Sequence, residues 1–127
     1  MTYNLAILGG GPGGYVAAIR ATQLKSKVVL IERDEVGGTC LNRGCIPTKA
    51  ILSSLEVLSH IKESEKFGID IKGEIKTDLS KIIDRKNNIV KQLNNGVKFL
   101  LKKKGVDVIN GSGFIKNRNE IEITESD

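Results

Sequence analysis

The sequence predicts an α/β fold that combines a strand–helix–strand unit on a parallel sheet, long helices and a C-terminal β-hairpin. Three observations predict it. A short apolar run at residues 4–8 ends abruptly in glycines, and a helical pattern leads from there to a second apolar run at 27–32. Two long helical patterns follow. Residues 113–124 then resemble two short strands around a turn at 117–119.

The first unit comprises about thirty residues. The run NLAIL at 4–8 has the continuous apolar character of a buried parallel strand. Residues 13–25 predict a helix with a face of small alanines, and KVVLIE at 27–32 predicts a second buried strand. Because a helix joins the two strands, we expect them to pair in parallel.

The middle of the chain predicts two further helices. Apolar residues recur at spacings of three and four from residue 48 to about 65. The segment IDIKGEI at 69–75 allows a short strand in the connection that follows. Thr77 or Asp78 is a suitable N-cap for a long helix that continues to about residue 104.

After that helix, Gly105 is a natural C′ residue, and VDVIN at 106–110 predicts a third strand. The 127 residues fit a single domain. We find no internal repeat and no low-complexity linker.

Composition and charge limit the possible partners. The formal net charge is +5, but the densest basic run, residues 102–104, lies at a helix end, where cations offset the helix dipole. The chain has three Phe, two Tyr and no Trp, so aromatics do not accompany the basic residues, and we expect no nucleic-acid binding. No apolar run is long enough for a membrane span, and the N-terminus does not resemble a secretory signal. We therefore expect a cytoplasmic protein.

Gly9, Gly11 and Gly14 match the pattern G-x-G-x-x-G between a predicted strand and a predicted helix, and Glu32 ends the next strand. Gly9 permits the tight turn, Gly11 lets the backbone approach a pyrophosphate, and Gly14 lets the helix and the strand pack closely. The helix N-terminus supplies N–H groups for phosphates, and Glu32 can accept hydrogen bonds from ribose hydroxyls. A Rossmann-like dinucleotide site follows from this context. NAD and FAD both remain possible here.

Both cysteines, Cys40 and Cys45, lie in the segment GGTCLNRGCIPTKA at 37–50. A disulfide across so short a loop stabilises little compared with a longer loop. A zinc site needs about four ligands, and the single distant His60 does not complete one, so we expect no metal and a structural or solvated His60. A redox pair is the interpretation that the dinucleotide site favours.

The geometry of this pair requires a bend. Residues five apart in an ideal helix have Cα atoms about 8–9 Å apart, whereas a disulfide usually needs less than about 7 Å. We expect Gly44 and Pro47 to permit the bend, because Pro47 cannot donate a helical hydrogen bond. Arg43 and a helix N-terminus are expected to favour the thiolate.

The segment GGTCLNRGCIPTKA resembles the active-site signature of the flavoprotein disulfide reductases, or pyridine nucleotide-disulfide oxidoreductases. Its CLN-x-GCIPTKA form is most similar to the members that oxidise dihydrolipoamide. The stretch AILGGGPGGYVAAIRA is similar to the FAD-binding βαβ unit of the same family, and NGSGFI at 110–115 resembles its strand beside the FAD adenine. The resemblance covers almost the whole chain.

The resemblance implies FAD as the cofactor, and NAD as the electron acceptor of a full-length enzyme. Cys40 would be the interchange thiol, and Cys45 would lie against the isoalloxazine ring as the charge-transfer thiolate. Lys49 would tune the flavin, and Gly113 would offer its backbone to the adenine. Cys40 is also an implied FAD contact. The other implied FAD contacts are Gly9, Gly11, Pro12, Gly13, Gly14, Glu32, Arg33, Gly38 and Thr39.

The family's enzymes are several times longer than this chain. The resemblance therefore implies that residues 1–127 form the N-terminal part of an incomplete FAD-binding domain, without the NAD-binding and dimerisation domains. We expect little or no turnover from this part alone. The implied partners are the lipoyl-bearing proteins of 2-oxoacid dehydrogenase or glycine cleavage complexes, with a homodimer at full length. Two alternatives stay open: a glutathione- or mercury-type disulfide reductase, and a flavin-binding module without turnover.

Overall fold

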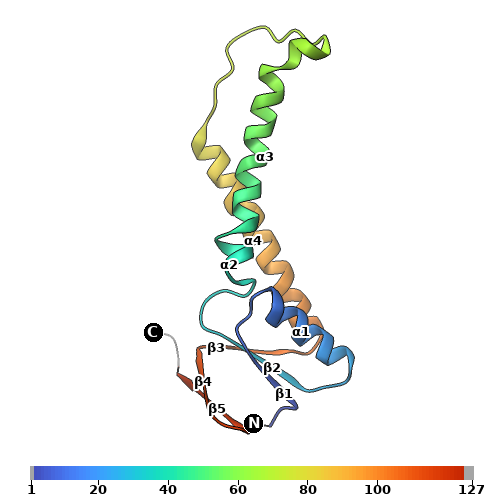
Figure 1. The fold of residues 1–127 in the computed structure, drawn as a ribbon, viewed down its shortest axis with the longest axis vertical. Helices are drawn as coiled ribbons and strands as arrows, with labels where there is room; N and C mark the ends of the chain where they lie inside the picture. Colours follow the sequence, from blue (N-terminus) through green and yellow to red (C-terminus); the bar gives the residue numbers. More distant parts are fainter. Residues whose placement is uncertain (1, 125–127) are drawn as a thin grey trace.

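Three parallel strands form the sheet on which the helices pack. They are β1 (Leu5–Leu8), β2 (Val28–Glu32) and β3 (Asp107–Asn110), and their order in the sheet is β1-β2-β3. Leu5 lies opposite Val28, and Val29 lies opposite Asp107. The computed structural model describes residues 2–124 (Figure 1). The predicted parallel α/β architecture is confirmed.

The core lies around the central strand. All of β2 is buried except its last residue, Glu32, which is half-buried. This agrees with the continuous apolar run that predicted it. Helices α1 (Pro12–Gln23) and α4 (Leu79–Lys103) pack beside this strand and contribute to the same core. The buried residues of this cluster are Ala18, Val28, Leu30, Val36, Leu41, Val97, Leu101 and Val106.

Strand β1 differs from its prediction. The apolar run at 4–8 predicts a buried strand, but Leu5 is 41% exposed and Leu8 is 40% exposed. The reason is its position, because β1 pairs with β2 on one side only and is an edge of the sheet among the described residues. Apolar character alone does not reveal which strand is central.

The two longest helices run side by side and extend away from the sheet (Figure 1). Helix α3 (Cys45–Lys62) begins three residues earlier than the sequence pattern indicated. Asp78 is the N-cap of α4, as predicted, and its carboxylate accepts hydrogen bonds from the backbone of Ser80 and Lys81. Arg85 of α4 donates to the backbone carbonyl of Ala50 in α3 at 2.8 Å, which joins the two helices.

The connection between α3 and α4 contains no strand. A 3₁₀ helix, η1 (Ser64–Phe67), follows α3, and the predicted short strand at 69–75 is wrong because these residues have no regular structure. Figure 1 shows this connection at the far end of the helices from the sheet. An alternating sequence forms a strand only where another strand can pair with it, and none of the described strands lies there.

The C-terminal part of the described chain is the predicted hairpin. Its strands are β4 (Ser112–Asn117) and β5 (Glu120–Thr124), which pair antiparallel. Gly111 donates its backbone N–H to the carbonyl of Glu32, and Gly113 packs so closely on β1 that an added Cβ would lie 2.5 Å from Leu8 Cδ2. The hairpin therefore lies across the carboxyl ends of β1 and β2.

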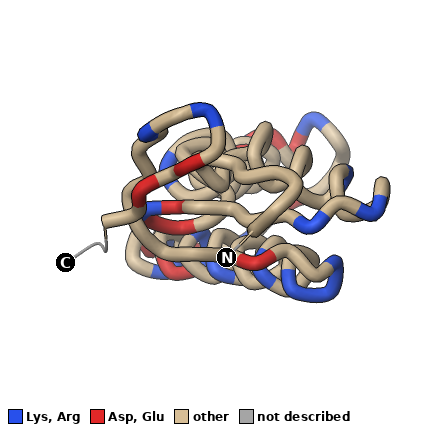
Figure 2. Tube along the Cα trace, turned by 90° about the horizontal axis from the view of Figure 1, so that it is seen from below, with Lys and Arg blue, Asp and Glu red and all other residues tan. Residues whose placement is uncertain are grey.

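Figure 2 shows Lys and Arg at several separate places along the trace, with Asp and Glu among them. Gly105 adopts a positive φ of 72° after α4, as expected for a C′ residue. Within residues 2–124, no helix combines the length and the apolar character that crossing a bilayer requires.

Candidate functional site

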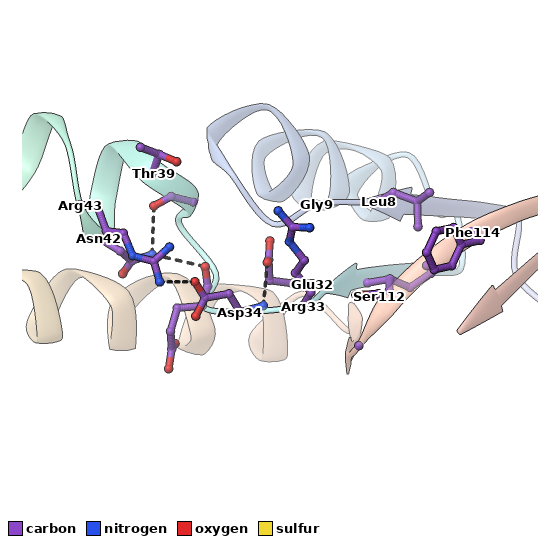
Figure 3. Close-up of a pocket in the computed structure, with 15 residues that line it drawn as sticks. Leu8, Gly9, Glu32, Arg33, Asp34, Thr39, Asn42, Arg43, Ser112 and Phe114 are labelled. Carbon is purple, nitrogen blue, oxygen red and sulfur yellow. Dashed lines mark hydrogen bonds and ion pairs between the residues drawn. The ribbon is translucent and has the colours of Figure 1, made fainter. Parts of the chain in front are cut away.

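A cavity of about 470 Å³ opens at the carboxyl ends of β1 and β2 (Figure 3). One wall is α2 (Gly38–Asn42), a short helix that precedes α3, and the opposite wall is β4. This is the edge of a parallel sheet at which ligands of α/β proteins bind. The lining residues are Leu8, Gly9, Ile31, Glu32, Arg33, Asp34, Glu35, Gly38, Thr39, Asn42, Arg43, Gly111, Ser112, Gly113 and Phe114.

The structure brings together part of the predicted site in this cavity. Six of the predicted cofactor contacts line it: Gly9, Glu32, Arg33, Gly38, Thr39 and Gly113. The other predicted contacts, which do not line it, are Gly11, Pro12, Gly13, Gly14, Cys40 and Lys49. Most of the predicted contacts that do not line the cavity lie beside it, at the first turn of α1 and on α2.

The carboxylate of Glu32 lies between two backbone segments. Its Oε2 accepts a hydrogen bond from the N–H of Gly10 at 2.6 Å, and its Oε1 accepts one from the N–H of Asp34 at 2.9 Å. The side chain thus joins the end of β2 to the glycine turn and to the loop that follows. Each carboxylate oxygen can accept more than one hydrogen bond, so Glu32 keeps acceptor capacity toward the cavity.

One glycine of the predicted motif and one of the cysteine segment allow contacts that no side chain would permit. A Cβ on Gly14 would lie 1.8 Å from the carbonyl oxygen of Gly9, so the start of α1 packs directly on the turn. A Cβ on Gly38 would lie 2.8 Å from the Cα of Gly11, so the start of α2 packs on the same turn. The N–H of Gly37 also donates to the carbonyl of Gly10 at 2.7 Å. The glycine turn and the cysteine segment therefore form one packed unit.

Sequence reasoning missed several residues of the cavity. Asp34, Asn42 and Arg43 come from the segment between β2 and α3, while Ser112 and Phe114 come from β4. A usable signal existed for the first three, because they lie between two predicted motifs whose ends meet at one edge of the sheet. For the hairpin residues, the resemblance of NGSGFI at 110–115 marked the segment, but not which of its side chains line the cavity, since that depends on long-range packing.

The two cysteines lie on either side of a bend between helices. Cys40 is on α2 between Thr39 and Asn42, and Cys45 is the first residue of α3. The predicted bend is confirmed, since α2 ends before Arg43 and Gly44 has φ −122° and ψ −106°. Both cysteines are thiols in the structure; Cys40 is half-buried and Cys45 is exposed.

Pro47 does not contribute to the bend in the predicted way. It lies in the first turn of α3, where a backbone N–H has no helical acceptor in any case. The first hydrogen bond of α3 runs from the N–H of Thr48 to the carbonyl of Gly44 at 3.1 Å. The bend is therefore produced by the residues between the helices.

The electrostatics of the pair also differ from expectation. The side-chain hydrogen bond with Cys45, followed by burial, raises the pKa of the Cys40 thiol above its ordinary value, while the Lys49 ammonium opposes the shift. The thiolate of Cys40 is thus disfavoured, contrary to the expectation based on Arg43. The guanidinium of Arg43 instead forms an ion pair with Asp34. Lys49, one turn after Cys45, is the cation that opposes the rise in the pKa of Cys40.

His60 is exposed in the last turn of α3, away from the bend between α2 and α3. Across the described residues, no three side chains of His, Cys, Asp or Glu gather in a way that could hold a metal ion.

The sequence of this chain is similar to those of known proteins. The family profile described as "Pyridine nucleotide-disulphide oxidoreductase" matches residues 3–126. A dihydrolipoyl dehydrogenase of Acholeplasma laidlawii is 58% identical over 119 residues, which are 94% of this chain and 35% of that protein. Dihydrolipoyl dehydrogenases of Rhizobium etli and Bacillus subtilis are each 46% identical and match 98% of this chain, but only 26% and 29% of their own lengths.

The chain thus spans about a third or less of the length of these relatives. The match nevertheless includes the glycine turn and the hairpin, which contribute residues to the cavity, and the segment that carries both cysteines. The chain belongs to the pyridine nucleotide-disulphide oxidoreductase family.

Proposed function

We propose that this chain is the N-terminal, FAD-binding part of a dihydrolipoamide dehydrogenase, and that Cys40 and Cys45 are its redox pair. Family membership implies FAD and NAD as cofactors. The observation that carries the proposal is the packing of the cysteine segment on the glycine turn through Gly38 and Gly11. That contact supports a thiol pair next to the turn that would bind the nucleotide.

The described residues fit an FAD molecule in their chemistry. The glycine turn precedes α1, whose first N–H groups have no helical acceptor and can bind the pyrophosphate. Glu32 has acceptor capacity for ribose hydroxyls, and the backbone of Gly113 lines the opposite wall. A cavity of about 470 Å³ between them has the size range of a cofactor site.

The cysteines would carry out the thiol chemistry by disulfide exchange. A thiolate of dihydrolipoamide attacks Cys40 Sγ in the Cys40–Cys45 disulfide, and Cys45 leaves as a thiolate. The second substrate thiol then attacks the substrate sulfur of this mixed disulfide, which releases lipoamide and the Cys40 thiol. Two electrons have moved from the substrate to the two cysteines. FAD, when bound, supplies the transfer of these electrons to NAD⁺.

Residues 1–127 would then be part of a longer enzyme, and we expect little or no NAD⁺ reduction by this chain alone. Support comes from the relatives, which are about three times longer or more. Their name points to lipoyl-bearing proteins as partners of the whole enzyme. A glutathione- or mercury-type reductase would use the same cysteines, and a non-catalytic flavin module would use only the cavity.

The proposal is tested on the first half of the reaction. The chain is oxidised, purified without reductant and mixed anaerobically with either dihydrolipoamide or reduced glutathione. Mass spectrometry follows the Cys40–Cys45 disulfide, and chromatography follows the released lipoamide. We expect stoichiometric lipoamide and loss of the disulfide with dihydrolipoamide, and slower reduction by glutathione.

Other outcomes would contradict the proposal. Faster reduction by glutathione would favour a glutathione-type enzyme. Binding of FAD by a chain whose thiols never form a disulfide would favour the non-catalytic module. A Cys45→Ser chain is the control, because it cannot form the internal disulfide and therefore cannot oxidise dihydrolipoamide.

A further inference from the structure

Helix α4 contributes a buried amide to the loop that carries the cysteine segment. The side chain of Asn94 is 7% exposed. Its Nδ2 donates to the backbone carbonyl of Val36 at 2.7 Å and to Oδ1 of Asn42 at 3.1 Å. Asn94 does not line the cavity and is 58 residues away from Val36 in sequence. A buried amide with two such partners fixes the position of both.

Asn42 continues this network within the cysteine segment itself. Its Nδ2 donates to the carbonyls of Glu35 at 3.3 Å, Val36 at 3.0 Å and Gly38 at 3.1 Å. These carbonyls belong to the loop before α2 and to the first residue of α2. Asn42 therefore holds both ends of the helix, and Asn94 fixes the orientation of the Asn42 amide.

Helix α2 depends on such contacts from other elements. It has five residues, and its N-cap, Gly37, provides no side-chain hydrogen bond and has a φ of 100°. An isolated helix of this length is not stable in water, because the free-energy cost of nucleation exceeds the stabilisation from so few hydrogen bonds. Cys40 lies in this helix, whereas Cys45 lies in the separate helix α3. The distance between the two thiols thus depends on how α2 is held.

Neighbouring ion pairs do not replace the amides. Arg43 pairs with Asp34, and Lys98 of α4 pairs with Glu35 at 2.7 Å, but all four side chains are about half exposed or more. Exposed pairs of this kind contribute little and are screened by salt. Beside the apolar contacts of Val97 and Leu101 with the same buried cluster as Val36, the Asn94 amide is a buried hydrogen-bonded connection between α4 and the loop before Cys40.

We infer that Asn94 is a positioning residue for the redox pair, which acts through Asn42 and Val36 to keep Cys40 within reach of Cys45. This inference rests on the proposed function of the two cysteines. When the amide is lost, α2 becomes looser and the effective concentration of one thiol near the other falls. The disulfide then becomes easier to reduce, although no residue that contacts it has changed.

The test is the reduction potential of the Cys40–Cys45 pair in the 127-residue chain. Wild-type, Asn94→Leu and Asn94→Asp chains are equilibrated in glutathione redox buffers, and the disulfide fraction is measured by mass spectrometry after acid quenching. Leu keeps the volume of the side chain, and Asp keeps its shape, but neither provides the N–H donors at neutral pH. The matched control is Asn95→Leu, which changes the adjacent exposed asparagine of α4.

We expect both Asn94 variants to form the disulfide about 3- to 10-fold less readily than wild type, and a tenfold change corresponds to a potential about 30 mV higher. The Asn95→Leu chain should titrate like wild type. Thermal unfolding measured beside each titration ensures that only folded chains are compared.

Two failures are distinguishable. If wild type forms the disulfide and folded Asn94→Leu and Asn94→Asp chains titrate at the same potential, the positioning role is wrong and the redox pair stands. If the wild-type chain does not form the disulfide at any buffer ratio, the proposed function is wrong, and the inference falls with it.

Discussion

The carboxylate of Glu32 accepts a hydrogen bond from the backbone N–H of Gly10 at 2.6 Å, across 22 residues of sequence. It thereby fixes the glycine turn against the end of β2, and its second oxygen fixes the following loop through the N–H of Asp34. One side chain thus joins the glycine turn and the loop after β2 at the base of the cavity. Its charge is part of this arrangement, because both partners are donors.

Glu32→Gln should weaken FAD binding. The neutral amide has one oxygen, so it can satisfy only one of the two backbone donors and turns an NH₂ group toward the other. Hydrogen bonds to a charged group contribute about 1.5–3 kcal/mol, so we expect the FAD dissociation constant to rise about 10- to 100-fold. Titration of FAD fluorescence measures it. Glu74→Gln, in the exposed connection before α4, is the control, and equal affinities for the two variants would contradict the assigned role.

Gly14→Ala should destabilise the chain, whereas Gly13→Ala should not. A Cβ on Gly14 would lie 1.8 Å from the Gly9 carbonyl oxygen, whereas a Cβ on Gly13 would have no atom within 4 Å. We expect Gly14→Ala to destabilise the chain by about 1–3 kcal/mol or more, and Gly13→Ala to be neutral or to stabilise it by about 0.5–1 kcal/mol as a helical alanine. The midpoints of urea unfolding of the two variants and the wild-type chain provide the measurement. Similar midpoints would show that α1 does not pack on the turn as described.

Cys45→Ala should make the Cys40 thiol more reactive. The hydrogen bond with Cys45 is the largest cause of the raised pKa of Cys40, and Lys49 acts against it. Removal of Cys45 lowers that pKa, so more thiolate is present near neutral pH and alkylation by iodoacetamide becomes about two- to threefold faster. Lys49→Met should slow the alkylation of Cys40, because it removes the positive charge that lowers the pKa of this thiol. Alkylation rates of Cys40 across a pH series provide the measurement, and a slower reaction of the Cys45→Ala chain would be the contrary result.

Asp78→Ala should destabilise the chain at neutral pH and much less in acid. The hydroxyl and backbone of Ser80 and the backbone of Lys81 bind the Asp78 carboxylate and lower its pKa, with the hydroxyl as the largest cause. A depressed folded-state pKa stabilises the fold above the unfolded pKa of about 3.9, and this contribution is lost as pH falls through the lower folded value.

We therefore expect the melting temperature of Asp78→Ala to lie about 3–5 °C below wild type at pH 7, with a smaller gap below about pH 4. Asp84→Ala, at an exposed position inside α4, is the matched control and should show no such pH-dependent loss. A gap that is constant from pH 7 to pH 3 would mean that the carboxylate charge is not what caps α4.

Local patterns in the sequence predicted the parts of the fold that depend on local chemistry. The apolar run of β2, the glycines of the turn and the cap at Asp78 each reflect a requirement that nearby residues satisfy. The bend between Cys40 and Cys45 was predictable for the same reason, since a disulfide between residues five apart does not fit one regular helix.

Long-range packing determines what the sequence could not predict. The exposure of β1 depends on strand order, and the failure of 69–75 to form a strand depends on the lack of a partner among the described strands. The contact of Asn94 with Val36 joins residues 58 apart, and nothing near either residue indicates the other. A five-residue helix such as α2 is also too short to produce a periodic pattern.

The most direct test of the central claim is electron transfer between the two thiols and FAD. The fully reduced chain is mixed anaerobically with stoichiometric FAD, and flavin absorbance is followed while the Cys40–Cys45 disulfide is measured by mass spectrometry. We predict loss of the oxidised-flavin absorbance in step with disulfide formation, and no loss with the Cys45→Ser chain. Unchanged absorbance from a reduced wild-type chain that demonstrably binds FAD would contradict the account.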